Sequence, residues 1–199
     1  MRTQACAVYA CLAVSFLLLP VPTIGQEKIE QLILSEVYLD NAEPLRCWIE
    51  VYNPADRALV LERFRLSHIK TINVFSKEIQ DRGGIEVQPG EYLVLCADSD
   101  LFSATYGTEI KPIAVDGLSH LASGGFLVIA TKGGKEHKGT ITRYGEAERS
   151  SHAAGLAGAQ VLGFSREGKS YSRRIVKTPT GDSVSDFSQS TPTPGKPNK

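Results

Sequence analysis

The chain lacks the short motifs that mark the commonest enzyme and metal sites. Its 199 residues contain no Gly-x-Ser-x-Gly, no His-x-His and no Cys-x-x-Cys. These absences argue against an α/β-hydrolase nucleophile elbow and against a structural zinc site. Nothing in the composition indicates that a serine, a histidine and an acid lie together in the fold. We therefore expect no catalytic residue, no metal site and no cofactor. The four histidines are His68, His120, His137 and His152.

The chain also lacks an excess of charge, since 22 Lys and Arg residues balance 22 Asp and Glu residues. A domain that binds nucleic acid usually carries a basic excess on one face, so nucleic-acid binding is a weak alternative. Arg173 and Arg174, with Lys169 and Lys177, form the densest basic group, and a second lies at 132–138. Such bases equally fit a solvated edge strand, where they discourage aggregation.

Long apolar runs are missing except at the N-terminus. Arg2 is the only charge before Glu27, and residues 5–19 are almost wholly apolar. This pattern, followed by small residues, predicts a secretory signal peptide over 1–25, cleaved after Gly25. The alternative is an uncleaved anchor, but the run is shorter than the ~20 residues that span a bilayer. We therefore expect a secreted or extracytoplasmic protein, in the periplasm or at the cell surface, without a membrane span after cleavage.

Residues 26–199 are expected to form a single domain. Its core would cover about 30–177, and the segment 178–199 is rich in Pro, Thr and Ser with few apolar groups. We expect this segment to be loosely structured, except that Phe187 could pin it to the core. The region 147–163, rich in Ala, Gly and Ser, is expected to be a long loop or an insertion.

Cysteine is scarce, and signal cleavage would leave only Cys47 and Cys96. Two cysteines in an exported chain suggest a disulfide. The alternative is two separate buried thiols. Strand alternation turns Cys96 away from Leu93 and Leu95, so if these leucines face the core, the disulfide would need a bulge.

No segment of helical length shows sustained 3.6-residue periodicity. Short β-branched and aromatic runs recur instead between Gly, Pro, Asn and Asp, which favours an antiparallel sandwich or barrel. One short helix is expected over 99–106, with a Ser or Asp cap, and Lys132 to Lys135 is expected to form a hairpin turn. The expected strands cover 32–39, 47–52, 58–69 (as one or two strands), 72–75, 91–97, 126–131, 140–144 and 172–176.

Two segments are the most distinctive. Residues 47–52 read Cys-Trp-Ile-Glu-Val-Tyr and run into Asn53-Pro54, and residues 192–198 read Pro-Thr-Pro-Gly-Lys-Pro-Asn. With the segments around them, in this order, they resemble the lamin tail domain of exported bacterial proteins, over about residues 30–198. The segments that carry the resemblance are 35–37, 48–54, 61, 64–66, 89–95, 125–129, 142–145, 170–173 and 190–198.

The resemblance implies an immunoglobulin-like antiparallel β-sandwich with no established catalytic activity. Bacterial domains of this kind look like accessory modules, often attached to nucleases, phosphoesterases or other surface enzymes. We therefore expect an exported, non-enzymatic module that binds or scaffolds an extracytoplasmic protein or polysaccharide. The alternatives are a nucleic-acid-binding accessory domain and a small exported hydrolase with a site built from loops.

Alternation along the strand at 47–52 places Trp48, Glu50 and Tyr52 on the face opposite Cys47. If exposed, the two aromatic residues would form a platform for a sugar or a partner. A lone Trp in a sandwich more commonly packs in the core. We name Trp48, Glu50 and Tyr52, with Arg173 and Arg174, as the candidate binding residues.

Acidic residues suggest two further sites, each with a simpler interpretation. Glu36 and Glu50 could pair as glycosidase-like carboxylates, but we prefer a solvated outer sheet face or a nearby Arg partner. Asp98 and Asp100, with Asp40 as a distant partner, could offer oxygens to Ca²⁺. Since calcium takes about six to eight oxygens, we interpret Asp98-Ser99-Asp100 as an Asx turn or helix cap.

Overall fold

The computed structural model describes residues 31–67, 74–75, 83–123, 125–131, 141–144, 164–165, 168–174 and 186–198. Several expected features lie outside these residues, namely the signal peptide at 1–25, the hairpin turn at 132–135 and the loop at 147–163. Within the described residues no helix is long and apolar enough to cross a membrane.

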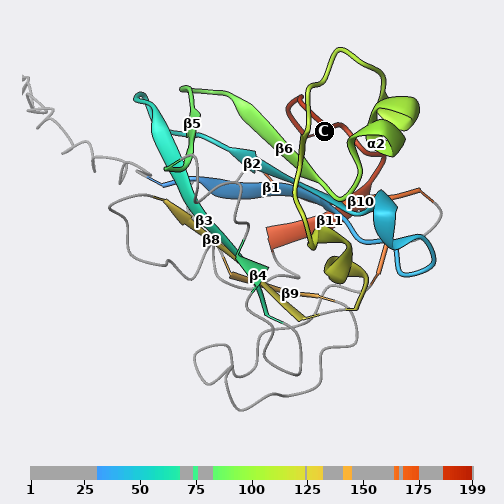
Figure 1. The fold of residues 1–199 in the computed structure, drawn as a ribbon. Helices are drawn as coiled ribbons and strands as arrows, with labels where there is room; N and C mark the ends of the chain where they lie inside the picture. The colour runs from blue at the N-terminus through green and yellow to red at the C-terminus, as the bar shows by residue number, and fades with distance from the viewer. Residues whose placement is uncertain are drawn as a thin grey trace, which may run out of the picture.

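The described residues are mostly β and form two sheets, consistent with a β-sandwich (Figure 1). The first sheet contains β1 (Ile33–Tyr38), β2 (Trp48–Tyr52), β6 (Tyr92–Cys96), β7 (Ile113–Ala114), β10 (Ser170–Arg173) and β11 (Phe187–Ser190). The second contains β3 (Leu59–Ser67), β4 (Val74–Phe75), β5 (Ile85–Val87), β8 (Gly125–Thr131) and β9 (Ile141–Tyr144). Their orders are β11-β10-β1-β2-β6-β7 and β4-β3-β8-β9, with β5 also paired to β3. Among these pairs, only β6 and β7 run parallel.

The expected short helix is confirmed as α2 (Ser99–Tyr106). Asp98 is its N-cap, because its carboxylate accepts from the N–H groups of Asp100 and Leu101 at 2.9 Å. The cap interpretation of Asp98-Ser99-Asp100 is therefore confirmed. Two 3₁₀ helices, η1 (Pro44–Arg46) and η2 (Leu118–Ser123), complete the helical elements of the described part.

Most expected strands are present, with shifted ends. The structure describes the region 58–69 only as far as Ser67, and this part holds one strand, β3; β10 begins at Ser170 rather than at residue 172. Strands β5, β7 and β11 were not predicted, because runs of two to four residues hardly show an alternation. The expectation of a loose tail is wrong for β11, whose Phe187 is buried in the core between the sheets, as expected for that side chain.

In the first sheet, β1 and most of β2 are buried on both faces. One face packs against the second sheet through Leu34, Ile49, Leu95 and their neighbours. The other face is covered by α2, which lies on the same side as the red C-terminal segment in Figure 1. We call the cluster on this second face the outer layer; it contains Tyr38, Trp48, Val94, Cys96 and Phe102, with Tyr106 and Ile110 packed against it.

A β-bulge in β1 sets which side chains share a face. Leu34 pairs with Val51 and Glu36 with Glu50, so Ser35 is the extra residue. Two residues of β1, Ser35 and Glu36, therefore oppose the single residue Glu50. The sequence pattern does not reveal the bulge, although it decides what Glu50 faces.

The Asn53-Pro54 turn joins the two sheets. Asn53 is fully buried, and its Nδ2 donates to the carbonyl oxygens of Val87 on β5 at 2.8 Å and of Arg57 at 2.9 Å. Its Oδ1 accepts from the N–H of Ala55 at 2.9 Å. This use of every amide atom explains why Asn follows the strand, since an unpaired buried polar group is costly.

Cys47 and Cys96 are free thiols, so the disulfide suggested by the cysteine count is not formed. Cys47 lies in the core between the sheets, whereas Cys96 lies in the outer layer beside Trp48. Their side chains point to opposite faces of the first sheet, and a disulfide requires Cβ atoms that approach each other. Burial raises the pKa of each thiol to about 11, which makes both poor nucleophiles.

Candidate functional site

The most unusual site in the described part of the chain is a buried pair of carboxyl groups. Glu36 on β1 and Glu50 on β2 are directly opposite each other, and neither side chain has any exposed surface. Our expectation of a solvated outer face or an Arg partner is wrong here. No cationic side chain among the described residues bonds to either carboxyl group.

Glu36 is held by β10 and by the C-terminal segment. It accepts a short hydrogen bond from the hydroxyl of Ser170. The backbone N–H of Thr193 donates to its Oε1 at 3.1 Å, and Thr193 Oγ1 lies 3.3 Å from its Oε2. Three donors thus converge on this carboxyl group, an arrangement that suits a negative charge.

Glu50 has fewer donors. Ser35 Oγ lies 2.5 Å from its Oε1, and the backbone N–H of Gly195 donates to its Oε2 at 2.5 Å. The donor of the second bond comes from the same C-terminal segment that bonds to Glu36. We call residues 191–198 the C-terminal strap, because they cross both strands at the carboxyl pair.

The C-terminal strap is anchored at its far end by Asn198. The Nδ2 of Asn198 donates to the carbonyl oxygens of Ser35 at 2.9 Å and of Arg173 at 3.3 Å. Gly195 has a φ of +74°, a value that favours glycine, and it lies against the side chain of Ile110 in the outer layer. The strap and α2 therefore cover adjoining parts of one sheet face.

Burial controls the ionisation of the pair. It raises the pKa of Glu50 to about 8, against the lowering effect of the bonds from Ser35 and Gly195, and the nearby Glu36 raises it further. Burial also raises the pKa of Glu36, although the bonds from Ser170 and Thr193 oppose this. Sequence reasoning paired the two residues but did not foresee the strap, because Glu36 and Thr193 are 157 residues apart.

Trp48 does not form an exposed platform, since it is only 1 % exposed. Its ring meets Phe102 and Tyr106 edge to face, at centroid distances of 5.8 and 5.6 Å, and its Nε1 donates to Tyr106 Oη at 3.2 Å. Core packing is therefore the correct interpretation of Trp48. Tyr52 is half-buried and stacks on Tyr92 at 4.6 Å.

Arg173 is also unavailable for a ligand. Its Nη1 contacts Asp186 Oδ2 at 2.6 Å, its Nε donates to Leu34 O at 2.7 Å, and its guanidinium lies 4.5 Å from the centre of the Phe187 ring. Only Arg174 of the predicted basic pair faces solvent. The other bases of this group are Lys169, which is exposed, and Lys177, which lies outside the described residues together with Lys132, Lys135 and Lys138.

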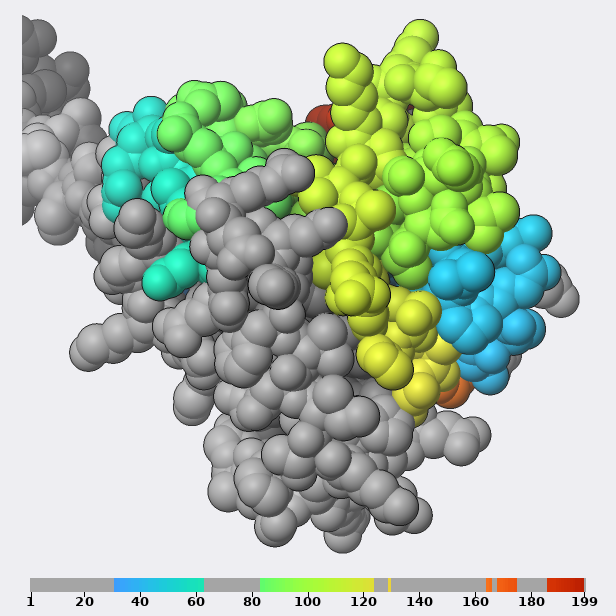
Figure 2. All heavy atoms as spheres, in the orientation of Figure 1, coloured from blue at the N-terminus to red at the C-terminus, as the bar shows by residue number. Residues whose placement is uncertain are grey.

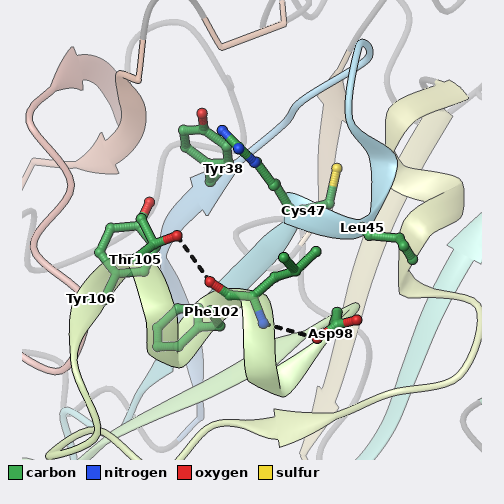
Figure 3. Close-up of a pocket in the computed structure, with 9 residues that line it drawn as sticks. Tyr38, Leu45, Cys47, Asp98, Phe102, Thr105 and Tyr106 are labelled. Carbon is green, nitrogen blue, oxygen red and sulfur yellow. Dashed lines mark hydrogen bonds between the residues drawn. The ribbon is translucent and has the colours of Figure 1, made fainter.

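A small pocket lies between η1 and α2 (Figure 3). Its volume is about 30 Å³, far below the ~300–1,000 Å³ of small-molecule sites. The residues that line it include Leu45 and Leu101, which are 52 % and 39 % exposed and are the exposed large hydrophobic residues of the described part. Figure 2 shows η1 in blue beside α2 in yellow-green, at one corner of the molecule.

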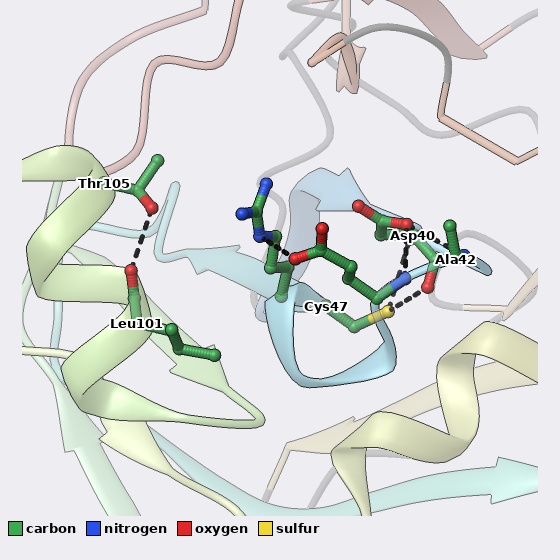
Figure 4. A network of polar contacts seen from close by, with 7 residues as sticks. Asp40, Ala42, Cys47, Leu101 and Thr105 are labelled. Atoms are coloured by element: carbon green, nitrogen blue, oxygen red, sulfur yellow. Dashed lines mark hydrogen bonds and ion pairs between the residues drawn. The ribbon is translucent and has the colours of Figure 1, made fainter.

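The rim of the pocket is fixed by local polar contacts (Figure 4). The carboxylate of Asp40 accepts from the N–H groups of Ala42 and Glu43 at 2.9 Å, and Glu43 forms a 2.5 Å ion pair with Arg46. The Cys47 thiol donates to Asp40 O at 3.4 Å. Leu45 is therefore presented from a well-braced turn.

The described residues contain no group of three or more His, Cys, Asp or Glu side chains that could hold a metal ion. His120 is exposed on η2, and the other three histidines lie outside the described part. Comparison with known proteins found no matching family model, no matching curated protein and no matching solved structure.

Proposed function

We propose that the chain is an exported, non-enzymatic β-sandwich module of the lamin tail type, with an immunoglobulin-like arrangement, that binds or scaffolds a protein partner outside the cytoplasm. One observation carries this proposal. The two most distinctive segments, 48–54 and 192–198, contact each other through Glu50 and Gly195. Two distant segments that meet in space are expected when both serve to build one fold.

The state of the carboxyl pair supports a non-enzymatic role. A general acid or base must come within hydrogen-bond reach of the proton that it transfers. Glu36 and Glu50 have no exposed surface and are bonded to serine, threonine and backbone groups of the protein itself. In this arrangement the two carboxyl groups hold the strap in place and do not contact a substrate.

Among the described residues we favour the pocket between η1 and α2 as the binding surface, because the exposed Leu45 and Leu101 lie beside it. Leu45 and Leu101 offer apolar contacts on a braced rim, and the pocket admits no more than a small side chain. This geometry fits an apolar side chain of a protein better than a sugar ring. Arg46 also lines the pocket but is paired with Glu43, whereas Asp98 lines the pocket and Asp100 is exposed on the first turn of α2. We therefore favour a partner segment that carries bases beside its apolar side chain.

Site-specific cross-linking in the exporting cell tests this proposal. A photoreactive residue in place of Leu45 or Leu101 should capture the same envelope protein, and one in place of the exposed Glu86 on β5 should not. Equal capture from all three positions, or none from the first two, would contradict the proposal. A nucleic-acid accessory role would appear instead as salt-sensitive retention on DNA that Arg174→Ala weakens.

A further inference from the structure

We propose that Glu36 and Glu50 form a proton-operated latch, in which Glu50 carries a proton while the C-terminal strap is closed and releases the strap when that proton is lost. The proposal concerns the motion of the strap and is independent of the partner that the η1–α2 pocket binds.

The hydrogen bonds show where the proton fits. Ser35 Oγ lies 2.5 Å from Glu50 Oε1 and 3.3 Å from the carbonyl oxygen of Glu50. A protonated Glu50 would donate to Ser35 Oγ, and the Ser35 hydroxyl would then donate to that carbonyl oxygen. Every donor in this series of hydrogen bonds has an acceptor. The separation of 2.5 Å lies at the short end of the range for O–H···O hydrogen bonds, so either oxygen can be the donor.

Glu36 fits the charged member of the pair. It faces the Ser170 hydroxyl, the Thr193 N–H and the Thr193 hydroxyl, whereas Glu50 faces one backbone N–H and one hydroxyl. A carboxyl group with more donors ionises first, and its charge then disfavours ionisation of the second. The pair therefore consists of an ionised Glu36 opposite a protonated Glu50.

No described charge nearby would neutralise a second anion. The ionisable groups on the pair's face of the sheet are Tyr38 on β1, Tyr52 on β2 and Tyr92 on β6, and Cys96 of β6 and Tyr106 of α2 lie further along the same face. Burial raises the pKa of Tyr92 and of Tyr106 to about 12, so both stay neutral while Glu50 titrates. Arg173 on β10 is paired with Asp186, and Lys196 on the strap is exposed.

Loss of the proton thus places two like charges opposite each other on side chains that have no exposed surface. The strap is the covering segment that is displaced most easily. Residues 191–198 follow the last strand of the first sheet, and Thr193 and Gly195 bond them to the pair. Lifting the strap would hydrate both carboxylates. The raised pKa of Glu50, about 8, sets the direction: the latch is closed in acid and opens as the pH rises through that value.

Amide hydrogen exchange of the full chain tests the latch. The N–H groups of Thr193 and Gly195 bond to the carboxyl groups, whereas those of Ala97 and Val115 bond to backbone carbonyls. After correction for intrinsic rates, protection of the first two amides should fall by about tenfold or more between pH 6 and pH 9. Protection of Ala97 and Val115 should fall only as far as the global free energy of unfolding falls over the same pH range, and protection of the strap amides should fall further.

Two variants make the outcome specific. Glu50→Gln retains an oxygen for Gly195 and an amide for Ser35, so strap protection should remain high at pH 9. Glu36→Gln removes the like charge, so that Glu50 ionises alone. The fall in strap protection should then move to lower pH or vanish. Wild-type protection that does not change with pH, or a fall that persists unchanged in Glu50→Gln, would overturn the proposal.

Discussion

Glu50→Gln should make the protein more stable than wild type at pH 8–9 and about equally stable at pH 5. Burial gives Glu50 a pKa of about 8 in the folded chain, against 4.5 for an ordinary glutamate. Between these values the folded state keeps a proton that the unfolded state has released. Stability of the wild type must therefore fall as the pH rises through this interval.

The difference between a pKa of 4.5 and one of about 8 corresponds to a loss of at most about 5 kcal/mol in the free energy of unfolding. Urea unfolding at pH 5, 7 and 9 measures it, and the fluorescence of Trp48, the chain's only Trp, follows the transition. The matched control Glu86→Gln changes an exposed residue and should keep the wild-type slope. Stability that rises from pH 5 to pH 8 would contradict a proton on Glu50.

Trp48→Ala should destabilise the protein by about 3–5 kcal/mol, the usual loss when a large buried aromatic residue becomes Ala. Trp48 is the centre of the outer layer, where Tyr38 stacks on it at 6.2 Å and Phe102 and Tyr106 meet it edge to face. Without it α2 loses its main contact with the sheet. Thermal or urea unfolding, followed by circular dichroism, measures the loss.

Tyr106→Phe separates packing from hydrogen bonding in the same cluster. It keeps the ring but removes the oxygen that accepts from Trp48 Nε1 at 3.2 Å. We expect a loss of about 1–3 kcal/mol, because a buried donor is left unpaired. A Trp48→Ala loss no larger than that of Tyr106→Phe would indicate that α2 does not rest on Trp48 as described.

The elements with strong local signals were predictable from the sequence. Asp98 precedes the best helical candidate in the sequence, and it caps α2. Leu93 and Leu95 shared a face that excluded Cys96, and this face meets the core between the sheets. Phe187 was the one large apolar residue of a polar tail, and it is buried there.

The candidate site was less predictable, because long-range contacts decide it. Alternation assigned Glu50 to the second face of β2, but nothing near it in sequence indicated that α2 and the strap cover that face. No pattern in the sequence predicts the β-bulge at Ser35, yet this bulge places both Ser35 and Glu36 opposite Glu50. Arg173 was interpreted as a surface base, since its partner Asp186 lies in the segment 178–199 that we expected to be loosely structured.

The latch and the pH dependence of stability both require a proton on Glu50 beneath the strap. Carbon-13 NMR of the glutamate side-chain carboxyl carbons, assigned with Glu50→Gln and Glu36→Gln, reports this state directly as the pH is varied. We predict that the Glu50 resonance titrates with a pKa near 8, together with the loss of strap contacts. A Glu50 carboxyl group that titrates near the ordinary value of 4.5 would contradict the account.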